Sequence, residues 1–430
     1  MLNARSIAFW TKDFINGRTI RKYYDEIIEG YKIGVCEELV KSKIKKICEY
    51  ASENTDFYSK KTYNSFNDFP VMNKGIYVEN YEQFLSKEFS DLHGCRKMST
   101  SGSTGTPFTV IHNSVKTKRC NASVVFFNGL ADYHLGEKMT ELRVWSSGTD
   151  TSKFRAWMKN LYMYDISYLD DESLLQLLQK IKKDRVKTLI GYSSTYTALV
   201  KSMKRMGIDG KDLPVKSIIA ASESLPDETA KGIEELFGVR VTMRYSNMEN
   251  GIMAERFEDN RYYIDSSSFY IEILDEDDKP VPQGEVGRIV VTDLYNHAFP
   301  MIRYDTGDTG AVVKENTENN SYRLWFTDVY GRRTDMIYNT KGNMLSPHVI
   351  TNNMWDIPKV KQYKFIQKDV NDYVIELNVE DGFDQESKVI QLLSDALGAD
   401  SNVQVKYVDE IPVLASGKRR YIVNEMNNKK

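Results

Sequence analysis

The sequence predicts an α/β protein with at least two domains, and three observations lead to this prediction. The chain has 430 residues, more than a single hydrophobic core usually serves. In its middle part helical patterns alternate with short β-branched runs, which is typical of a parallel sheet. Strand and turn signals then take over, and a short α+β pattern closes the chain. We expect a large N-terminal α/β part with a β-rich subdomain, followed by a small, mobile α+β domain.

Apolar residues at helical spacing predict helices over 37–50, 173–183 and 227–237, the last ended by Gly238. Runs rich in β-branched residues predict strands at 186–190, 217–221 and 239–243. Because helices and strands alternate here, the strands are expected to be parallel. From 269 to 313 the pattern changes to strands joined by turns such as 275–280 and 282–284. This part is expected to be more antiparallel.

The last hundred residues predict a small domain of mixed composition. Strand patterns are found at 362–367, 372–379 and 403–408, with a helical pattern at 385–397 between them. Residues 1–94 show helical patterns with aromatic interludes, which suggests a packing layer, and they are the least informative part for function.

Composition excludes several classes of partner. The net charge is −3 and Lys and Arg are scattered, so neither nucleic-acid nor membrane binding is indicated. No apolar run reaches the ~20 residues of a membrane span, and the N-terminus lacks a signal-peptide core, so we expect a cytoplasmic protein. Cys36, Cys48, Cys95 and Cys120 match no zinc or disulfide pattern and are expected to be reduced.

The most informative stretch is Ser-Thr-Ser-Gly-Ser-Thr-Gly-Thr-Pro at 99–107, before the strand pattern 108–111. Small residues leave backbone N–H groups accessible, so such a loop can wrap a phosphate. Thr106 follows Gly105 where a P-loop would have lysine, which excludes that motif. A flexible surface loop is the alternative.

Further segments place ligand-binding residue types at strand ends or turns. Tyr245 and Glu249 follow the strand pattern 239–243, where α/β sheets place ligands, and they could stack on adenine and bind Mg²⁺. The segment 303–308 surrounds a glycine turn with an arginine and two acids, and a carboxylate there could accept ribose hydroxyls. A half-buried tyrosine and an ordinary hairpin turn are the alternatives.

Two basic residues lie nearer the C-terminus. Arg332 belongs to a Gly-Arg-Arg-Thr-Asp segment and is a candidate for ribose or phosphate contact through its forked donors. Lys418 lies in a small Ser-Gly-Lys turn. A charged linker and a solvated loop are the alternatives.

Taken in order, these segments resemble the adenylate-forming enzymes, which include acyl-coenzyme A synthetases and the adenylation domains of peptide synthetases. The chain looks most like the phenylacetate-coenzyme A ligase branch and its relatives associated with capsular polysaccharide synthesis. The resemblance covers roughly residues 95–423. It implies an ATP- and acid-binding domain over 1–331 and a small domain over 332–430 that carries the catalytic lysine.

The resemblance also implies roles for individual residues. It makes Lys418 and Glu249 catalytic, with Glu249 as the Mg²⁺ ligand. It assigns ATP or AMP binding to the small-residue loop, a small-small-acid segment, the aromatic segment, the ribose acid and the hinge arginine: Thr100, Ser101, Gly102, Ser103, Thr104, Gly105, Thr106, Ser222, Glu223, Tyr245, Ser246, Asp308 and Arg332.

An acid pocket is expected from aromatic and polar residues that flank these motifs in the family's order: Phe126, Phe127, Trp145, Tyr192 and Asn247. Core packing is the alternative for the phenylalanines and the tryptophan. The chain departs from the family pattern at Met248, where a hydroxyl residue usually stands, and at Thr334, where relatives carry aspartate directly after Gly-Arg-x, with Asp335 one position later here.

The implied reaction is ATP-dependent activation of a carboxylic acid to an acyl-adenylate with release of pyrophosphate. Transfer of the acyl group to a thiol, amine or hydroxyl would follow, and coenzyme A, a carrier protein or a sugar is left open as the acceptor. Mg²⁺ and ATP are the implied cofactors, with coenzyme A as a further one, and a homodimer is left open. The alternatives are a nucleotidyltransferase that passes AMP to a carboxylate-bearing cofactor, and a non-catalytic nucleotide-binding relative.

Overall fold

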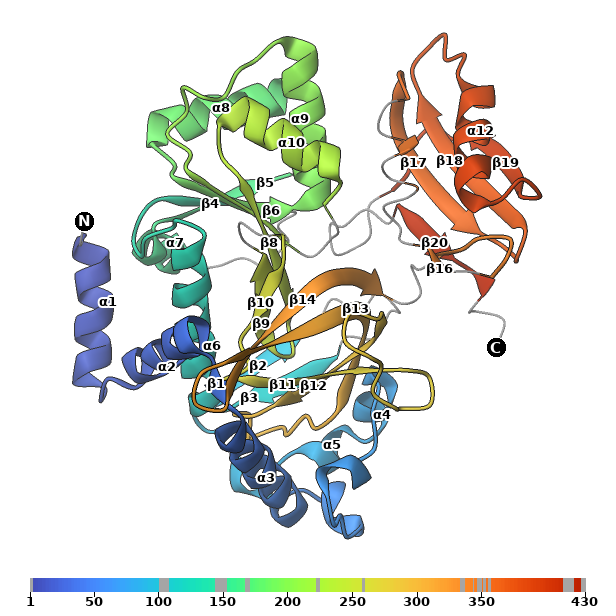
Figure 1. Ribbon diagram of the computed structural model, residues 1–430. Helices are drawn as coiled ribbons and strands as arrows, with labels where there is room; N and C mark the ends of the chain where they lie inside the picture. Colours follow the sequence, from blue (N-terminus) through green and yellow to red (C-terminus); the bar gives the residue numbers. More distant parts are fainter. Residues whose placement is uncertain are drawn as a thin grey trace.

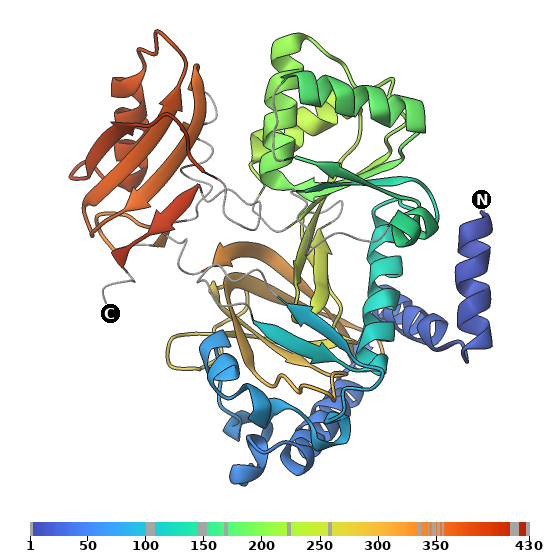
Figure 2. The same cartoon turned by 180° about the vertical axis from the view of Figure 1, so that it is seen from behind.

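The fold is that of a computed structural model (Figure 1), seen from behind in Figure 2. It describes residues 3–99, 108–143, 153–166, 171–221, 225–256, 260–332, 337–342, 344–345, 350, 353–354, 357–412 and 421–426. Within these residues a 12-stranded sheet forms the large N-terminal part, and a four-stranded sheet forms the C-terminal part. The predicted mixed α/β class is confirmed.

One half of the large sheet is parallel, in the strand order β5-β4-β6-β7-β8. Its strands are β4 (Met139–Arg143), β5 (Leu161–Asp165), β6 (Thr188–Tyr192), β7 (Ser217–Ala221) and β8 (Val241–Asn247). The helices near them are α7 (Lys153–Lys159), α8 (Asp171–Asp184), α9 (Ser193–Met206) and α10 (Asp227–Phe237). Gly238 ends α10 in a left-handed conformation (φ 66°), which glycine adopts without strain. The predicted alternation of helices and parallel strands is confirmed.

The other half of the sheet is antiparallel and continues from β8 in the order β9-β10-β14-β13-β12-β11. Its strands are β9 (Gly251–Arg256), β10 (Tyr262–Ile264), β11 (Phe269–Leu274), β12 (Gly287–Asp293), β13 (Tyr304–Thr317) and β14 (Ser321–Arg332). The short strand β1 (Val35–Cys36) pairs with β14, and β2 (Arg96–Ser99) pairs with β3 (Thr109–His112). The β-rich character expected after residue 268 is therefore correct.

The N-terminal hundred residues form the packing layer expected from their helical patterns. They contain α1 (Ala4–Ile15), α2 (Thr19–Ile33), α3 (Glu37–Asn54), α4 (Lys74–Glu79), α5 (Tyr81–Phe84) and the 3₁₀ turns Tyr58–Lys60, Phe66–Asp68 and Lys87–Phe89. Helix α6 (Ser114–Leu130) packs against α2 and β9. Arg303 ties this layer to the sheet, because its guanidinium pairs with Glu272 at 3.0 Å and donates to the carbonyl of Phe69 at 3.0 Å.

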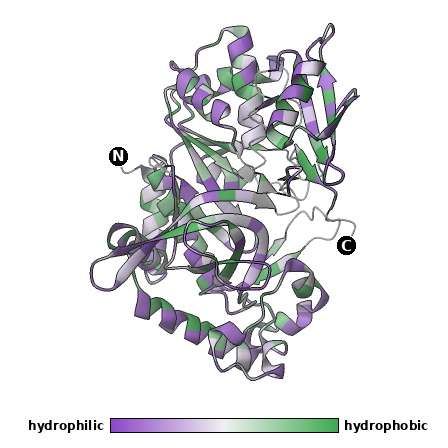
Figure 3. Cartoon of the chain, turned by 45° about the vertical axis from the view of Figure 1, so that its right-hand side comes forward, coloured by the Kyte–Doolittle hydropathy of each residue, from purple (hydrophilic) through white to green (hydrophobic). Residues whose placement is uncertain are grey.

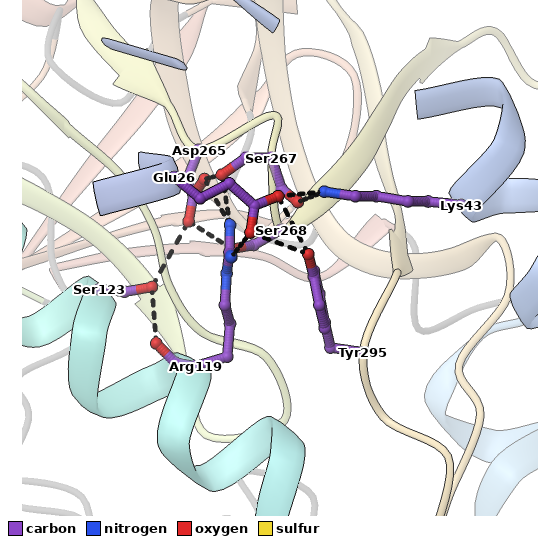
Figure 4. A network of polar contacts seen from close by, with 8 residues as sticks. All are labelled: Glu26, Lys43, Arg119, Ser123, Asp265, Ser267, Ser268 and Tyr295. Atoms are coloured by element: carbon purple, nitrogen blue, oxygen red, sulfur yellow. Dashed lines mark hydrogen bonds and ion pairs between the residues drawn. The ribbon is translucent and has the colours of Figure 1, made fainter. Parts of the chain in front are cut away.

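A buried polar network also joins α2 to α6 (Figure 4). Arg119 of α6 donates to Glu26 of α2 at 2.5 Å and to the Ser268 hydroxyl at 2.6 Å. Asp265 accepts from Ser268 at 2.5 Å and lies 3.8 Å from the Arg119 guanidinium. Burial alone would raise the pKa of Glu26, but the charges of Arg119 and Lys43 outweigh it and lower that pKa.

The C-terminal part has a core of its own. Strands β17 (Val360–Gln367), β18 (Asp372–Val379), β19 (Asn402–Tyr407) and β20 (Ile422–Asn424) form a sheet in the order β19-β18-β17-β20, with α12 (Glu386–Leu397) against β19. A hairpin of β15 (Ile337–Tyr338) and β16 (Met344–Leu345) precedes them. In Figures 1 and 2 these orange and red elements form a separate body. The domain boundary at 331/332 stays a prediction, because residues 333–336 lie outside the described part.

The pattern of burial agrees with this architecture. One extended cluster of buried apolar side chains lies under the large sheet, and a second, with Phe365, Ile375 and Leu393 among its members, lies in the C-terminal part. The helices around the large sheet present both hydrophobic and hydrophilic residues (Figure 3). All four cysteines are unpaired. Among the described residues, we find no helix with the length and apolar character that crossing a membrane requires.

Candidate active site

The candidate site lies at the carboxyl ends of the parallel strands. The sheet register places Tyr192 at the end of β6 beside Ala221 at the end of β7, and Ala221 beside Arg244 of β8. Strand β8 continues through Tyr245 to a turn that carries Glu249 and returns as β9. The carboxyl edge is where α/β sheets bind ligands, because the strands end there and loops of variable sequence take over.

Tyr245 and Asp308 meet at this edge, although 63 positions separate them in the chain. The Tyr245 hydroxyl donates to an Asp308 carboxylate oxygen at 2.9 Å and to the Thr306 hydroxyl at 3.4 Å. The ring of Tyr245 packs edge-on against Phe326, with the ring centroids 5.6 Å apart. Burial and the neighbouring Asp308 charge hold the pKa of Tyr245 well above its ordinary value. The phenol therefore stays protonated and orients the carboxylate.

Arg332 joins the same group through the backbone. In the antiparallel pairing of β13 with β14, Asp308 lies opposite Arg332, next to a register shift between Asp308 and Thr309. The side chain of Arg332 lies outside the described atoms. The structure thus brings the predicted aromatic residue, ribose acid and hinge arginine into one neighbourhood.

Glu249 lies in the turn that follows β8. The residue is only 5% exposed, and one carboxylate oxygen accepts a hydrogen bond from the Tyr304 hydroxyl at 3.3 Å. A carboxylate has about four acceptor positions, so this contact leaves capacity for a hard cation. No group of three or more His, Cys, Asp or Glu suited to a metal is found in the part of the chain that the structure describes. A single carboxylate still fits Mg²⁺, which is usually held by one or two carboxylates together with substrate phosphates and water.

Side chains from the end of β3 and from helix α6 contact the backbone of the turn between β8 and β9. His112 contacts the carbonyl of Glu249 through its Nε2 at 2.7 Å, and the Lys116 ammonium donates to the carbonyl of Asn250 at 2.8 Å. Burial, together with the nearby Lys116 charge, lowers the pKa of His112 to about 4. The imidazole is therefore neutral near pH 7, and its Nε2 donates to the carbonyl as the N–H tautomer.

Ser246 and Asn247 also lie in the β8–β9 hairpin, opposite Ile252 and Gly251. Asn247 accepts a hydrogen bond from the backbone N–H of Asn250 at 2.7 Å, which closes the turn. Met248, where the family usually has a hydroxyl residue, is 45% exposed. The turn is therefore formed without that hydroxyl.

Two residues predicted for the acid pocket lie in the core packing that was the alternative. Phe126 and Phe127 are buried on α6 in a cluster with Ile27, Tyr263 and Trp325. Their rings contact Tyr263, and Phe126 also contacts Tyr31 of α2. We therefore leave both out of the proposed pocket and keep Tyr192 and Asn247, which lie at or beside the strand ends.

Several predicted site residues lie outside the described part, and their assignments stay predictions: Thr100, Ser101, Gly102, Ser103, Thr104, Gly105, Thr106, Trp145, Ser222, Glu223 and Lys418. Their flanks are described. In the chain, β2 ends at Ser99 before the small-residue loop and β3 begins at Thr109 after it, and β7 ends at Ala221 before Ser222.

We call residues 248–251, where β8 turns into β9, the site turn. No role was predicted from the sequence for three residues that contact it. Tyr304 lies inside the 303–308 motif, but only the arginine and the acids of that motif suggested chemistry. His112 and Lys116 follow the small-residue loop by a few positions. The signal that could have indicated His112 and Lys116 is their position close after the predicted phosphate loop. Their contacts with the site turn depend on the path of β9, which the sequence analysis did not predict.

Comparisons with known proteins show which proteins this chain resembles. The model of the CapK C-terminal domain family matches residues 337–425. The chain is 22% identical to protein CapK of Staphylococcus aureus over 96% of this chain and 95% of the relative. It is 25% identical to the phenylacetate-coenzyme A ligase of Thermus thermophilus over 44% of this chain and 43% of that enzyme.

Among solved structures, 2-hydroxyisobutyryl-CoA ligase in its postadenylation state superposes with a TM-score of 0.72 at 15% identity, covering 91% of each chain. This likeness concerns the fold, which extends over the large sheet and the C-terminal part. By sequence, the chain is similar to CapK and to phenylacetate-coenzyme A ligases, which resemble the adenylate-forming enzymes, and its residues 337–425 match the CapK C-terminal domain family.

Proposed function

We propose that the protein activates a carboxylic acid with ATP, forming an acyl-adenylate and pyrophosphate, and then passes the acyl group to coenzyme A. The observation that carries the proposal is the hydrogen bond between Tyr245 and Asp308 at this sheet edge, with Glu249 in the turn that follows β8. A ribose acceptor, its orienting phenol and a cation ligand are the groups that a nucleotide site needs. Relatives named phenylacetate-coenzyme A ligase and the fold shared with 2-hydroxyisobutyryl-CoA ligase support this reading.

In the first step a carboxylate oxygen of the acid attacks the α-phosphorus of ATP. The new O–P bond replaces the bond from the α-phosphorus to the oxygen that bridges to the β-phosphate, and pyrophosphate leaves. Two anions approach each other, so the site must stabilise the charge that develops between them. Mg²⁺ at Glu249 would supply part of that positive charge. Backbone N–H groups of the loop at 100–106 and the ammonium of Lys418 are proposed to supply the rest.

The described residues act mainly by positioning the nucleotide. Asp308, oriented by Tyr245, would accept the two ribose hydroxyls. Fixed acceptors restrict how the nucleotide sits, so that the α-phosphorus faces the incoming carboxylate. Tyr192 and Asn247 are proposed to border the acid.

In the second step the sulfur of coenzyme A attacks the acyl carbon, and AMP leaves with the oxygen that came from the acid. We propose that the small C-terminal domain over 332–430 moves between the two steps, because Lys418 belongs to it. A role in surface polysaccharide synthesis is proposed from the likeness to CapK.

The proposal is tested by incubating the protein with ATP, Mg²⁺ and a panel of aryl, acyl, amino and sugar acids, with and without coenzyme A. Mass spectrometry of the products should show AMP and, when coenzyme A is present, the thioester of one acid. Formation of an adenylylated cofactor with no thioester would support the nucleotidyltransferase instead. Binding of ATP without any product would support a non-catalytic role.

A further inference from the structure

Three consecutive residues of the site turn, 249–251, lie against the end of β3 and the first two turns of helix α6. His112 Nε2 is 2.7 Å from the carbonyl oxygen of Glu249, and Lys116 Nζ is 2.8 Å from that of Asn250. A side chain at Gly251 would meet the sulfur of Cys120 at 3.2 Å, and the φ of Gly251 is 87°. Glycine therefore allows the chain both to turn here and to approach α6 closely.

Two of the contact residues, Lys116 and Cys120, are four positions apart on α6, whereas His112 is the last residue of β3. Side chains four positions apart lie on the same face of a helix, one above the next. Because α6 begins at Ser114, its N-cap Asn113 fixes the start of this face by accepting from the Lys116 backbone N–H at 2.8 Å. The turn is thus held by the end of β3 at Glu249 and by α6 at Asn250 and Gly251.

Lys116 is the charged member of this face, and it is almost completely buried. Lys116 and Asp293 are each 1% exposed, with the ammonium 2.6 Å from a carboxylate oxygen, and the ammonium also lies 4.5 Å from the centre of the Phe269 ring. A buried ion pair is weak evidence for stability, since well-packed apolar residues often serve as well. What this pair does provide is a fixed position for the ammonium that holds the Asn250 carbonyl.

The side chain of Glu249 depends on this backbone support. Within the described part of the chain, its side chain accepts one hydrogen bond, from the Tyr304 hydroxyl at 3.3 Å. The direction of the carboxylate is therefore set largely by the backbone on either side, where His112 and Lys116 hold successive carbonyls. Metal ligands are commonly oriented in this way by neighbours that do not touch the metal.

We infer that Lys116, held by Asp293, is a positioning residue that fixes the Glu249 carboxylate in the direction needed to bind the divalent cation. This inference rests on the proposed function, because that function makes Glu249 the cation ligand. It adds a residue that contacts neither the nucleotide nor the cation.

The test uses the double variant Lys116→Met with Asp293→Asn, which removes both charges and so leaves no unpaired buried charge. Asparagine keeps the side-chain oxygen that accepts from the Tyr295 backbone N–H at 2.9 Å. Mn²⁺ is titrated into the full chain with a non-hydrolysable ATP analogue, and bound Mn²⁺ is followed by electron paramagnetic resonance. The apparent Kd for Mn²⁺ is expected to rise about 10-fold, within the range typical of such supporting residues.

A matched control separates positioning from simple destabilisation. Ile47 of α3 is a buried core residue, 1% exposed, so Ile47→Ala should lower the Tm without affecting the site turn. Its Mn²⁺ affinity should equal that of the wild type. An unchanged Mn²⁺ Kd in the folded double variant would overturn the inference, and so would an equal loss in Ile47→Ala.

The proposed function is checked separately by pyrophosphate exchange in the wild type. If the wild type exchanges and the double variant binds Mn²⁺ normally, the inference fails and the function stands. If the wild type binds Mn²⁺ with the nucleotide but exchanges with no acid, the function fails, and the effect of the double variant on Mn²⁺ still decides whether Lys116 positions Glu249.

Discussion

Helix α6 carries two buried cations one turn apart, and they serve different regions of the molecule. Lys116 faces the turn with Glu249 and is balanced by one carboxylate, that of Asp293. Arg119 faces α2 and the 265–268 segment and contacts Glu26, Asp265, Ser267 and Ser268. Lys116 thus supports the turn that carries the proposed cation ligand. Arg119 instead pairs with carboxylates and hydroxyls for which no ligand is proposed.

The comparison shows why buried charge alone does not identify a site. The Arg119 network contains more charges than the Lys116 pair, but its carboxylates accept hydrogen bonds from donors within the network (Figure 4). The Lys116 ammonium holds the backbone of a turn whose carboxylate, Glu249, accepts one hydrogen bond among the residues that the structure describes. Groups with acceptor capacity to spare are the ones that can bind a ligand.

The largest effect is expected from Arg119→Met, which should remove the network between α2 and α6 and lower the free energy of unfolding without changing the candidate site. It leaves the carboxylates of Glu26 and Asp265 without their shared cation, which typically costs about 3–5 kcal/mol of unfolding free energy. Urea denaturation measures the loss. Mn²⁺ affinity of the folded fraction should be unchanged, and a large Mn²⁺ effect would show that the two regions are not separate.

The next largest effect is expected from Glu249→Gln, which should impair the candidate site and leave the stability of the fold nearly unchanged. Removing the carboxylate is expected to slow pyrophosphate exchange about 100-fold or more, the loss typical of a group that stabilises transition-state charge. The Tm should change little, because the hydrogen bond from Tyr304 can still be accepted by the amide oxygen. Exchange at the wild-type rate would remove Glu249 from the site.

A smaller effect is expected from Asp308→Asn. The amide is a weaker acceptor for ribose hydroxyls than the carboxylate, so we expect the KM for ATP to rise about 10-fold with a smaller change in kcat. Steady-state kinetics at saturating acid would measure this. Tyr245→Phe, which removes the orienting hydroxyl, should shift KM in the same direction by less. An unchanged KM in both variants would contradict the ribose assignment.

A further buried pair, Arg244 with Glu255, extends the comparison to pH. Burial raises the pKa of Glu255 from 4.5 to about 7, although Arg244 lowers it in part. The folded state therefore binds the proton more tightly than the unfolded state. The stabilisation is fully present below pH 4.5 and is lost as the pH rises through about 7.

In Glu255→Gln this pH dependence should disappear, a change of at most about 1.4 kcal/mol per pH unit. Denaturation curves between pH 4.5 and 7 compare the slopes of the variant and the wild type. Equal slopes would show that Glu255 does not titrate in this range.

Much of the fold could be predicted from periodicity. The helix at 227–237 and the strands at 217–221 and 372–379 begin and end as their patterns predict. The helix has one buried face and ends at Gly238, whereas the strand 217–221 is a short run buried on both faces. The pairing of β10 with β14 was not predicted, because it joins Tyr262 to Phe326, which lie far apart in the chain, and depends on tertiary packing.

Site residues with a recognisable chemical group at a strand end could be predicted from the sequence. Residues that only hold other site residues in position could not. Tyr245, Glu249 and Asp308 carry recognisable groups at strand ends, and the structure brings Tyr245 and Asp308 together. Phe126 and Phe127 were misleading as pocket residues, because aromatic character alone does not distinguish a pocket wall from the α2–α6 core. Lys116 gave no signal, because a lysine in a helix is usually exposed.

The measurement that tests the central claim most directly is exchange of labelled pyrophosphate into ATP with Mg²⁺ across the acid panel. Wild type, Glu249→Gln and Lys418→Ala would be compared at equal nucleotide occupancy. We predict exchange with at least one carboxylic acid in the wild type and its loss in both variants. Failure of every acid to support exchange, while ATP still binds, would contradict acid activation by this protein.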